Sequence, residues 1–542
     1  MPEMTGGEAV VGSLKQHGVD TLFGVPGIQL DHLFNALYEE RNSLRVIQTR
    51  HEQGAAYMAY GYAASTGKPG VCVVVPGPGL LNATAAISTG YACNAPMLCV
   101  VGQIPSGAIG KGLGQLHEIP DQLALIRGIT KFAERAEAPA EVPGLMRSAF
   151  EALTEGRARP VEVEIPMDTL AARDTFALGE PGGTASGPSL DSDAVEAAAK
   201  LLGEAQRPLI MVGGGIWGAE SELAALAEML QAPVVMSRNA LGALDDRHYL
   251  AQKYPVGNRL WADADVVLAV GTRLSPVIPA WGTDDGLKIV RIDIDPEELD
   301  RVCTPDVALL SDSAAGLAAL VDRTGAYNRV RASREEELTA MKQKFIAELH
   351  ENLGPQMAYL DVLRAGLPED GLFVEELTQV GYVARFGFPV YRPRSYIGSG
   401  YQGTLGFGFA TALGVKIGNP DRPVLSISGD GGFMYNVQEL STAVQQGIDL
   451  VAVVFSDGAF GNVQRMQIED HGGKVIATDL HNPDFVALAE SFGAQGLRAN
   501  SLPELGRALE TGFATPGPTL IDVPIGPTPA PWAYLNLPKA RG

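Results

Sequence analysis

Two aspartates, Asp430 and Asp457, each follow an apolar run with the composition of a buried strand. These runs, at 424–428 and 450–455, predict two strands of a parallel sheet, in which ligands bind beyond the carboxyl ends of the strands. Two carboxylates placed there offer hard oxygen ligands, which suit Mg2+ shared with phosphate oxygens. The glycines after each aspartate let backbone N–H groups approach a phosphate closely. The alternative is an ordinary strand–turn–helix unit with Asp and Gly as turn residues.

Glu52 is a second candidate, far from the first two in sequence. Within residues 46–65, a short predicted strand leads into Glu52, which stands where an Ala-rich helix with a small-residue face is expected to begin. A carboxylate buried at such a closely packed position is costly unless it has a partner, and carboxyl groups serve as general acids and bases. The alternative is a glutamate at a helix N-terminus, favoured there by the helix dipole.

The stretch 429–462 resembles the cofactor motif of thiamine diphosphate enzymes, which runs from Gly-Asp-Gly to Asn-Asn. Ser456-Asp457 stands where the family has Asn-Asn, and Asp keeps an oxygen ligand there. The resemblance implies that Asp430 and Asp457 bind Mg2+ through side-chain oxygens and that Ala459 binds it through its carbonyl. It also implies that the cofactor's diphosphate lies against the glycines of this motif, Gly431 and Gly432.

Glu52 follows Arg50-His51, a context in which decarboxylase-type members of the same family place a glutamate. The resemblance implies that Glu52 hydrogen-bonds a pyrimidine nitrogen of the cofactor. Through that contact it assists removal of the proton from the thiazolium carbon. Glu52 is therefore expected to be catalytic.

Further segments are similar to the family's motifs, in the family's order along the chain. They imply contacts with the pyrimidine ring, the diphosphate and the bend of the cofactor. The Gly403 carbonyl is expected to accept a hydrogen bond from the aminopyrimidine, and Leu405 to be the apolar fulcrum of the bend. The cofactor-binding residues implied in this way are Val25 in the first loop, Pro78 and Asn82 in 77–82, Thr378 and Gln379, and Gly403 and Leu405 in 400–406.

The substrate side of the expected site departs from the family's patterns. Leu116-His117-Glu118 stands where acetolactate synthases have a Phe-Gln pair, and Met466 stands where they have a Trp. The histidine that benzoylformate decarboxylases carry near residues 75–76 is absent. His117 is the candidate acid or base on this side, because histidine titrates near neutral pH. The alternative is a solvent-facing loop histidine.

Composition narrows the class of protein. The 542 residues are 46% hydrophobic and carry a net charge of −22, with 64 Gly and 36 Pro. The charge argues against nucleic-acid or anionic-membrane partners. The four cysteines form no CxxC pair, which is typical of a reducing compartment. No segment has the length and apolarity of a membrane span, and no leader is recognisable, so we expect a cytoplasmic protein.

Strand-like runs alternate with Ala-rich helical stretches, which predicts an α/β fold with three doubly wound parallel-sheet domains. A Gly/Pro/Ser-rich linker at 177–189 and a charged helix within 329–355 separate the domains. The segments that close the first and third domains, 159–166 and 517–524, are similar, which suggests two related domains. The expected limits are 1–176 for the pyrimidine-binding domain, 190–328 for the central domain, 356–527 for the diphosphate-binding domain and 528–542 for a Pro-rich tail.

The central domain contains Gly213-Gly214-Gly215 after a predicted strand, which is typical of nucleotide folds but weak evidence for a ligand. Acetolactate synthases bind FAD in this domain. The segment 253–257 and the stretch after Arg273 depart from their pattern, so FAD binding is possible but not favoured. The alternative is a purely structural domain.

These features predict a thiamine diphosphate- and Mg2+-dependent lyase or transferase acting on a small 2-oxo acid or an aldehyde. Decarboxylation and carboligation of the acetolactate synthase type are expected. One alternative is an acyloin or 2-hydroxyacyl lyase that works without decarboxylation. Another is a non-catalytic nucleotide-binding or regulatory subunit with the same fold. By resemblance, the partner is a second copy of the chain, in a homodimer or homotetramer.

Overall fold

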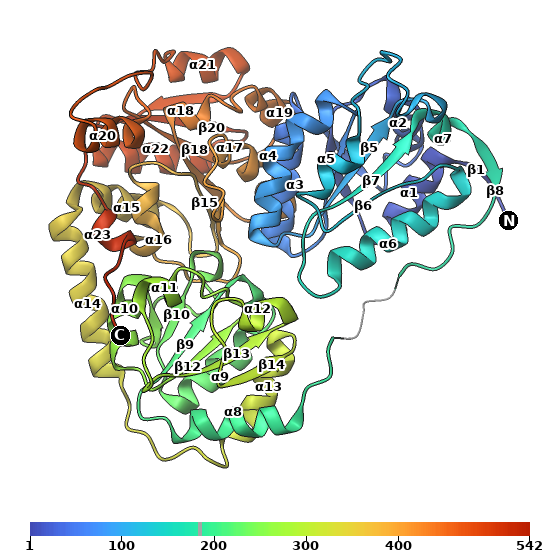
Figure 1. Ribbon diagram of the computed structural model, residues 1–542. Coiled ribbons are helices and arrows are strands. Elements are labelled where there is room, and N and C mark those ends of the chain that lie inside the picture. Colours follow the sequence, from blue (N-terminus) through green and yellow to red (C-terminus); the bar gives the residue numbers. More distant parts are fainter. Residues whose placement is uncertain (183–186) are drawn as a thin grey trace. The chain divides into compact units, whose positions relative to one another are not determined.

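The computed structural model describes residues 1–182 and 187–542, and these residues form three six-stranded sheets with helices packed on their faces (Figure 1). The predicted α/β class with three parallel-sheet domains is confirmed. A short antiparallel pair, β1 (Glu3–Thr5) with β8 (Arg173–Thr175), joins the two ends of the first domain. The predicted linker 177–189 includes residues 183–186, which lie outside the described residues.

The first sheet has the strand order β3-β2-β4-β5-β7-β6. Its central strands are buried along their whole length, because the sheet is covered on both faces and its strands read as continuous apolar runs. The strands are β2 (Thr21–Gly24), β3 (Arg45–Gln48), β4 (Gly70–Val74), β5 (Met97–Gln103), β6 (Phe132–Arg135) and β7 (Val161–Pro166). The helices are α1 (Gly6–Gln16), α2 (Asp31–Glu39), α3 (Glu52–Thr66), α4 (Pro78–Cys93), α5 (Gln122–Arg127), α6 (Val142–Thr154) and α7 (Met167–Ala171).

The third sheet repeats that topology, because its order is β16-β15-β17-β18-β20-β19. Counted along the chain, both sheets follow the order second, first, third, fourth, sixth, fifth. The strands are β15 (Leu372–Glu375), β16 (Tyr396–Gly398), β17 (Val424–Gly429), β18 (Val451–Ser456), β19 (Gln495–Arg498) and β20 (Thr519–Pro524). The helices are α15 (Gly354–Gly366), α16 (Gly381–Gly387), α17 (Gly408–Gly418), α18 (Asp430–Phe433), α19 (Glu439–Gln446), α20 (Gly461–Asp470), α21 (Phe485–Phe492), α22 (Leu502–Ala514) and α23 (Trp532–Leu535).

The central sheet differs from the other two. Its order, β11-β10-β9-β12-β13-β14, is the one found in dinucleotide-binding folds. Its strands are β9 (Pro208–Val212), β10 (Val234–Met236), β11 (Ala251–Gln252), β12 (Val266–Val270), β13 (Lys288–Asp293) and β14 (Val307–Leu310). Its helices are α8 (Ser192–Glu204), α9 (Glu220–Leu230), α10 (Tyr254–Asp263), α11 (Val277–Trp281), α12 (Pro296–Asp300) and α13 (Ser313–Thr324), and α14 (Glu335–Asn352) follows them.

Two compact units arise from these domains. Within the described chain, the first unit contains residues 1–182, 374–377 and 399–525, so it joins the N-terminal domain to most of the third domain. The second contains 187–373, 378–398 and 526–542. The limits predicted for the three domains from the sequence are not tested by this division.

Inside the first unit, α3 packs closely against α17, and each helix has a glycine at the contact. A Cβ atom on Gly61 would lie 2.1 Å from the carbonyl oxygen of Thr411. One on Gly414 would lie 1.9 Å from the carbonyl oxygen of Met58. Glycine at both positions lets the two helices approach at backbone distance. The helix that begins at Glu52 is therefore held by the third domain as well as by its own sheet.

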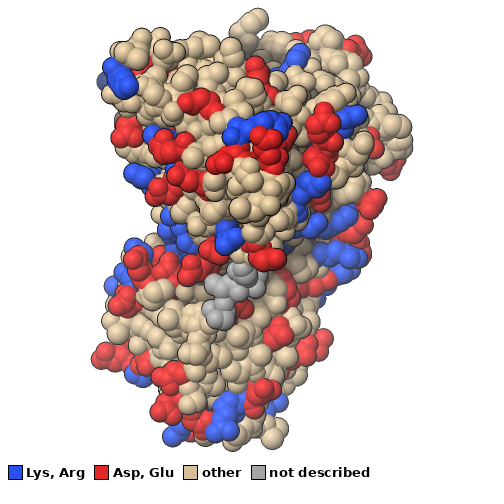
Figure 2. Space-filling view, turned by 90° about the vertical axis from the view of Figure 1, so that its right-hand side faces the viewer, with Lys and Arg blue, Asp and Glu red and all other residues tan. Residues whose placement is uncertain are grey.

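Among the described residues, no helix is both long enough and apolar enough to cross a membrane. On the face drawn in Figure 2, Asp and Glu side chains are interspersed with Lys and Arg.

Candidate active site

Several of the predicted site residues follow strands at the point in each of two sheets where the order of the strands reverses. In the first sheet, the order reverses between β2 and β4; Val25 lies in the loop after β2, and Pro78 begins α4, the helix after β4. In the third sheet, the order reverses between β15 and β17, and Asp430 directly follows β17. In open α/β sheets, crevices at such points are where ligands bind.

Glu52 and Asn82 are brought together at the N-terminal turns of α3 and α4. Asn82 Nδ2 donates a hydrogen bond to Glu52 Oε2 at 3.0 Å. Gly79 stands beside them, since a Cβ there would lie 3.6 Å from Glu52 Oε1. Among the described residues, Oε1 of this half-buried carboxylate accepts no hydrogen bond. Pro78, the first residue of α4, is exposed on the same turn.

Three loops that follow β2, β4 and β5 meet around the start of α4. Gly27, two residues after the half-buried Val25, lies against Val75, whose Cγ1 atom would be 2.4 Å from a Cβ on the glycine. The carbonyl of His117 packs on Gly77, where an added Cβ would lie 2.3 Å from that oxygen. Gly77 has a φ of +57°, so only glycine suits this turn.

His117 is held in an unusual backbone conformation. Its φ is +71°, in the left-handed region that side chains other than Asn, Asp and His seldom adopt. Its ring Nδ1 lies 3.1 Å from Oε1 of Gln29, and Gln29 Nε2 donates to the carbonyl of Leu116 at 3.0 Å. His117 is therefore half-buried and anchored beside the α4 turn, which argues against a freely solvated loop histidine.

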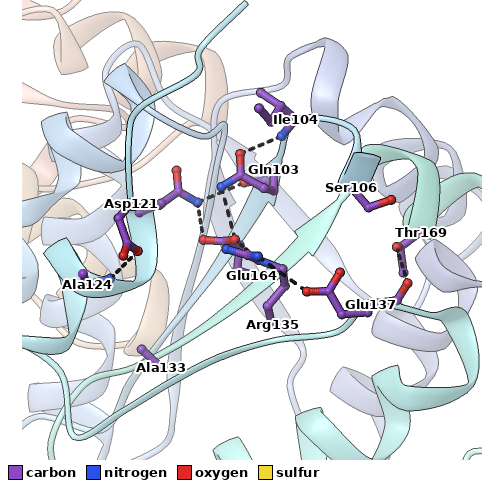
Figure 3. A network of polar contacts seen from close by, with 12 residues as sticks. Gln103, Ile104, Ser106, Asp121, Ala124, Ala133, Arg135, Glu137, Glu164 and Thr169 are labelled. Carbon is purple, nitrogen blue, oxygen red and sulfur yellow. Dashed lines mark hydrogen bonds and ion pairs between the residues drawn. The ribbon is translucent and has the colours of Figure 1, made fainter. Parts of the chain in front are cut away.

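A buried polar network holds the Gly77 turn, and Figure 3 shows its part around Glu164. Glu164 is fully buried and accepts hydrogen bonds from Gln103 Nε2 at 3.1 Å, from Gln122 Nε2 at 2.8 Å and from the Arg135 guanidinium. Figure 3 shows Gln103, Arg135 and Glu164 converging from β5, β6 and β7. Gln122 in turn accepts from the backbone N–H of Gly77 at 2.9 Å. The loop before Pro78 is thus tied to three strands through side-chain hydrogen bonds.

Asp430 and Asp457 directly follow the neighbouring strands β17 and β18. Asp430 is 2% exposed, and its Oδ2 accepts from Gly458 N at 2.8 Å and from Asn482 Nδ2 at 2.6 Å. The pKa of Asp457 is raised, first by the loss of hydration and then by the negative charge of Asp430. The two carboxylates are therefore close enough to repel each other, and a bound cation would relieve that repulsion.

Ala459 lies on the loop that begins at Asp457. Its backbone N–H donates to Asp457 Oδ1 at 3.2 Å, and it forms an isolated bridge with Asp479. The described residues contain no group of three or more His, Cys, Asp or Glu side chains that could hold a metal. A cation at Asp430 and Asp457 would need backbone or phosphate oxygens to complete its coordination, as Mg2+ commonly does.

Gly431 and Gly432 line the turn after Asp430, and neither position has room for a side chain. A Cβ on Gly431 would lie 2.6 Å from the Phe460 ring, and one on Gly432 would lie 2.1 Å from Oε1 of Glu376. Glu376 itself is fully buried after β15 and accepts from Gly406 N at 2.8 Å. This carboxylate thus supports both the Asp430 turn and the glycine-rich loop 400–406.

The pKa of Glu376 is raised to about 7, chiefly because burial removes its hydration, against the opposing effect of hydrogen bonds from Ser428, Gly408 and Gly406. A carboxyl whose pKa is higher in the folded state stabilises that state below its unfolded pKa, and this stability is lost as the pH rises through the folded value. In the cofactor-free protein, we therefore expect the free energy of unfolding to fall between pH 5 and 7.5. In Glu376→Gln the fall should be smaller, by roughly 1–3 kcal/mol.

Urea unfolding at both pH values measures this difference. The control is Glu510→Gln, because Glu510 is exposed on α22 and should leave the fall unchanged. An equal fall in Glu376→Gln and in the parent protein would contradict the assignment.

The loop 400–406 carries the predicted contacts Gly403 and Leu405. Its three glycines have positive φ values of 58°, 58° and 80°, which fold the loop tightly. Leu405 is half-buried, and the neighbouring Thr404 Oγ1 lies 3.0 Å from the hydroxyl of Tyr57 on α3. The loop is thus fixed between α3 and Glu376, which is what a rigid support for a bent ligand requires.

Thr378 and Gln379 belong to the second unit and are both buried. Thr378 Oγ1 accepts from Val380 N at 3.1 Å and from Gly381 N at 2.8 Å, so it caps the start of α16. Gln379 Oε1 accepts from Thr528 Oγ1 at 3.4 Å. Diphosphate binding by these two residues stays a prediction.

Four polar residues that support the candidate site were not singled out from the sequence: Gln122, Glu376, Glu439 and Asn482. Glu376 directly follows strand β15, and a carboxylate after a buried strand is the signal that identified Asp430. Glu439 opens α19, the next helix after the one that begins at Asp430, and the signal available for it was a carboxylate on the buried side of an amphipathic helix. Gln122 and Asn482 lie in segments without a motif, and only the fold reveals them.

Three family models match the chain in order. The thiamine pyrophosphate enzyme N-terminal TPP binding domain matches residues 4–125, the central domain matches 195–320, and the C-terminal TPP binding domain matches 378–523. The first match contains Glu52, Pro78, Asn82 and His117. The third contains the glycine-rich loop and both aspartates.

Several curated proteins are similar to the chain over nearly its full length. A probable 2-ketoarginine decarboxylase of Pseudomonas aeruginosa is 35% identical and covers 96% of this chain and 94% of its own. A probable acetolactate synthase large subunit of Methanocaldococcus jannaschii is 33% identical, over 97% and 93%. The acetolactate synthase isozyme 1 large subunit of Escherichia coli is 30% identical, over 96% and 94%.

Proposed function

The chain belongs to the thiamine pyrophosphate enzymes, of the acetolactate synthase and 2-oxo acid decarboxylase type, and from this premise we propose that it decarboxylates a small 2-oxo acid. The product is released as an aldehyde or joined to a second carbonyl compound. The observation that carries the proposal is the pairing of Glu52 with Asn82 at the switch point of the first sheet. Membership of an enzyme family sets aside the non-catalytic alternative.

The residues present fit the cofactor. Gly431 and Gly432 have no room for a Cβ beside Phe460 and Glu376, so this turn after Asp430 consists of backbone alone, and we propose that the diphosphate lies against it. We assign the diphosphate to this turn, and the pyrimidine to Glu52, Asn82, Pro78 and Val25. When bound, thiamine diphosphate supplies a thiazolium carbon that acts as nucleophile and electron sink.

In this proposal, Mg2+ is held by Asp430 and Asp457 together with the carbonyl of Ala459. The support is geometric, because Asp430 and Asp457 follow the neighbouring strands β17 and β18, and Gly458 N donates to Asp430 Oδ2 at 2.8 Å across the two loops. Asn482 donates to Asp430 at 2.6 Å and orients that carboxylate. Asp457 in place of the family's Asn adds one negative charge to this site.

In this proposal, Glu52 transfers a proton to or from the pyrimidine ring of the cofactor. Its Oε2 is engaged by Asn82 Nδ2, and this contact orients the carboxyl group and leaves Oε1 to hold or release a proton toward a pyrimidine nitrogen. His117, anchored by Gln29 beside the same turn, is the candidate that donates or accepts a proton on the substrate side.

The choice between reactions rests on the substrate side. The similarity to a probable 2-ketoarginine decarboxylase favours decarboxylation, while the acetolactate synthase relatives favour joining the product to a second carbonyl. Leu116-His117-Glu118 and Met466 depart from the acetolactate synthase pattern, which favours the first reaction. Cleavage of an acyloin or 2-hydroxyacyl compound is the second candidate. FAD in the central domain is not favoured.

The active form in this proposal is a homodimer, or a tetramer built from two dimers, with each pyrimidine site completed by the diphosphate domain of a second copy. Several segments next to the candidate residues expose large apolar side chains in the single chain. These are Leu81 beside Asn82, Leu116 beside His117, Tyr401 in the glycine-rich loop and Met466 in α20. A symmetric dimer would cover such a surface.

A panel of 2-oxo acids tests the proposed reaction. Pyruvate and analogues with branched, aromatic and guanidino side chains would be incubated with the protein, thiamine diphosphate and Mg2+. We expect CO2 from at least one acid, and the product, aldehyde or 2-hydroxyketone, then separates decarboxylase from ligase. Cleavage of a 2-hydroxyketone without CO2 release from any acid would support the lyase alternative and contradict the proposed reaction.

A further inference from the structure

A buried carboxylate of the third domain is bonded to the backbone just before Glu52. Glu439 is the first residue of α19 and has no exposed surface. Its Oε1 accepts from the backbone N–H groups of Arg50 at 3.2 Å and of His51 at 3.0 Å. Its Oε2 lies 3.2 Å from the same Arg50 nitrogen and accepts from Thr442 Oγ1 at 2.6 Å.

The two amides belong to the turn that leads into α3. N–H groups at a helix start have no partner within the helix, and buried ones need an acceptor from elsewhere. His51 caps the helix itself, because its ring Nδ1 accepts from Gln53 N at 3.1 Å. Glu439 accepts hydrogen bonds from the backbone N–H groups of Arg50 and of the cap residue His51 itself. The backbone that leads into α3 therefore has hydrogen-bond partners in both the first and the third domain.

Gly54 leaves the space that the Glu439 carboxylate occupies. A Cβ on Gly54 would lie 2.4 Å from Glu439 Oε1, so any side chain there would displace the carboxylate. The remainder of α3 is held separately, by the backbone contact of Gly61 with α17 and by the hydrogen bond of Tyr57 with Thr404. Glu439 therefore controls the first turn of α3, where Glu52 lies, rather than the helix as a whole.

We propose that Glu439 is a positioning residue for Glu52, acting by accepting the two backbone hydrogen bonds that fix the turn of Arg50 and His51. The proposal rests on the proposed function of Glu52 in proton transfer. A further consequence is that the turn before Glu52 is linked to the Asp430 turn. The Asp430 turn forms α18, and Glu439 begins α19, the next helix of the same segment. The proton-handling residue of the first domain is thus held by the segment that carries the metal-binding turn of the same chain.

Two substitutions at Glu439 separate acceptor geometry from charge. Glu439→Gln keeps a carbonyl oxygen for both amides and turns its NH2 group toward the Thr442 hydroxyl, so kcat should stay within about 3-fold of the parent. Glu439→Leu removes every acceptor, and kcat should fall about 10–100-fold with little change in KM, as expected when a reacting group is misplaced by about 1 Å. Thr442→Val is the matched control, because it removes only the hydroxyl contact.

Gly54→Ala breaks the same contact without changing residue 439, because the added Cβ would lie 2.4 Å from Glu439 Oε1 and displace the carboxylate. It should lower kcat as Glu439→Leu does. Because both substitutions break one interaction, the double variant should be no worse than the poorer single variant within about 3-fold. Additive losses would show that the two residues act independently and would overturn the proposal.

Hydrogen exchange in the cofactor-free protein gives a readout that does not depend on activity. The amide protons of Arg50 and His51 should be protected in the parent protein, in Glu439→Gln and in Thr442→Val. They should exchange at least about 10-fold faster in Glu439→Leu and Gly54→Ala. Unchanged protection in both of these variants would overturn the contact itself.

Exchange of the thiazolium C2 proton, followed by NMR with cofactor bound, tests the effect on Glu52. We expect slower exchange in Glu439→Leu and in Gly54→Ala, and near-parent exchange in Glu439→Gln. Parent-like exchange despite lost amide protection would overturn the positioning role, and so would a Gln variant as slow as the Leu variant. If instead Glu52→Gln exchanged like the parent, the proposed function of Glu52 would fail, whatever the Glu439 variants did.

Discussion

Glu52→Gln is expected to lower turnover about 10²–10⁴-fold, the usual contribution of a general acid or base. Glutamine keeps the size of the side chain and can still accept the hydrogen bond from Asn82 Nδ2, which measures 3.0 Å in the parent protein. It cannot hold or transfer a proton at the second oxygen. The loss should therefore appear in kcat, and cofactor binding should weaken much less.

Two measurements check this expectation. The kcat of the variant is compared with that of Glu39→Gln, which removes an exposed carboxylate at the end of α2 in the same domain. The rate at which the cofactor's C2 proton exchanges with deuterated buffer is then followed by NMR. A Glu52→Gln protein that exchanges this proton as fast as the parent would rule out the proposed role.

Asp430→Ala should abolish Mg2+-dependent binding of thiamine diphosphate. The substitution removes one of two metal carboxylates and leaves the N–H of Gly458 and the amide of Asn482 without their acceptor. Titration calorimetry with and without MgCl2 measures the effect. Asp430→Asn keeps an acceptor oxygen without the charge, so it separates collapse of the loop from loss of the cation.

Asp421→Ala is the control for this experiment, because Asp421 is exposed in the same domain. It should bind the cofactor like the parent protein. Unchanged affinity in Asp430→Ala would remove Asp430 from the metal site.

Mixing the two inactive variants then tests the assembly. If the Glu52 of one copy shares a cofactor with the Asp430 of another, a mixed dimer of Glu52→Gln and Asp430→Ala chains has one intact site. Activity should then return to as much as about one quarter of the parent value after co-refolding, because about half of the dimers are mixed and each has one site of two. No recovery, despite mixed dimers seen by mass measurement, would place both residues of each site on one chain.

The sequence predicted the fold well, because central buried strands such as β4 and β18 are almost wholly apolar. The runs at 424–428 and 450–455 correspond to β17 and β18, and the similar closing segments at 159–166 and 517–524 contain β7 and β20. The equal strand orders of the first and third sheets agree with the predicted relation between these domains. Periodicity and composition suffice for such elements, since burial on both faces dictates their residues.

From the residues alone, the candidate site was predictable only where a carboxylate directly follows a buried strand. Asp430 and Asp457 meet that criterion, and Glu376 meets it too. Glu439 could not be assigned a partner from the sequence, because its contacts with Arg50 and His51 span 389 and 388 positions. The left-handed backbone of His117 also escaped prediction, since it depends on packing against Gly77 and Gln29.

The close contact of α3 with α17 has a consequence for how the chain is made. The glycine faces of these helices cover each other, yet about 340 residues lie between the end of α3 and the start of α17, and at roughly 5–20 residues per second their synthesis takes about 20–70 s. During that interval, the nascent N-terminal domain presents an uncovered small-residue face to the cell. We therefore expect this domain to need shielding by a chaperone until the third domain emerges, and a fragment ending before residue 400 to aggregate.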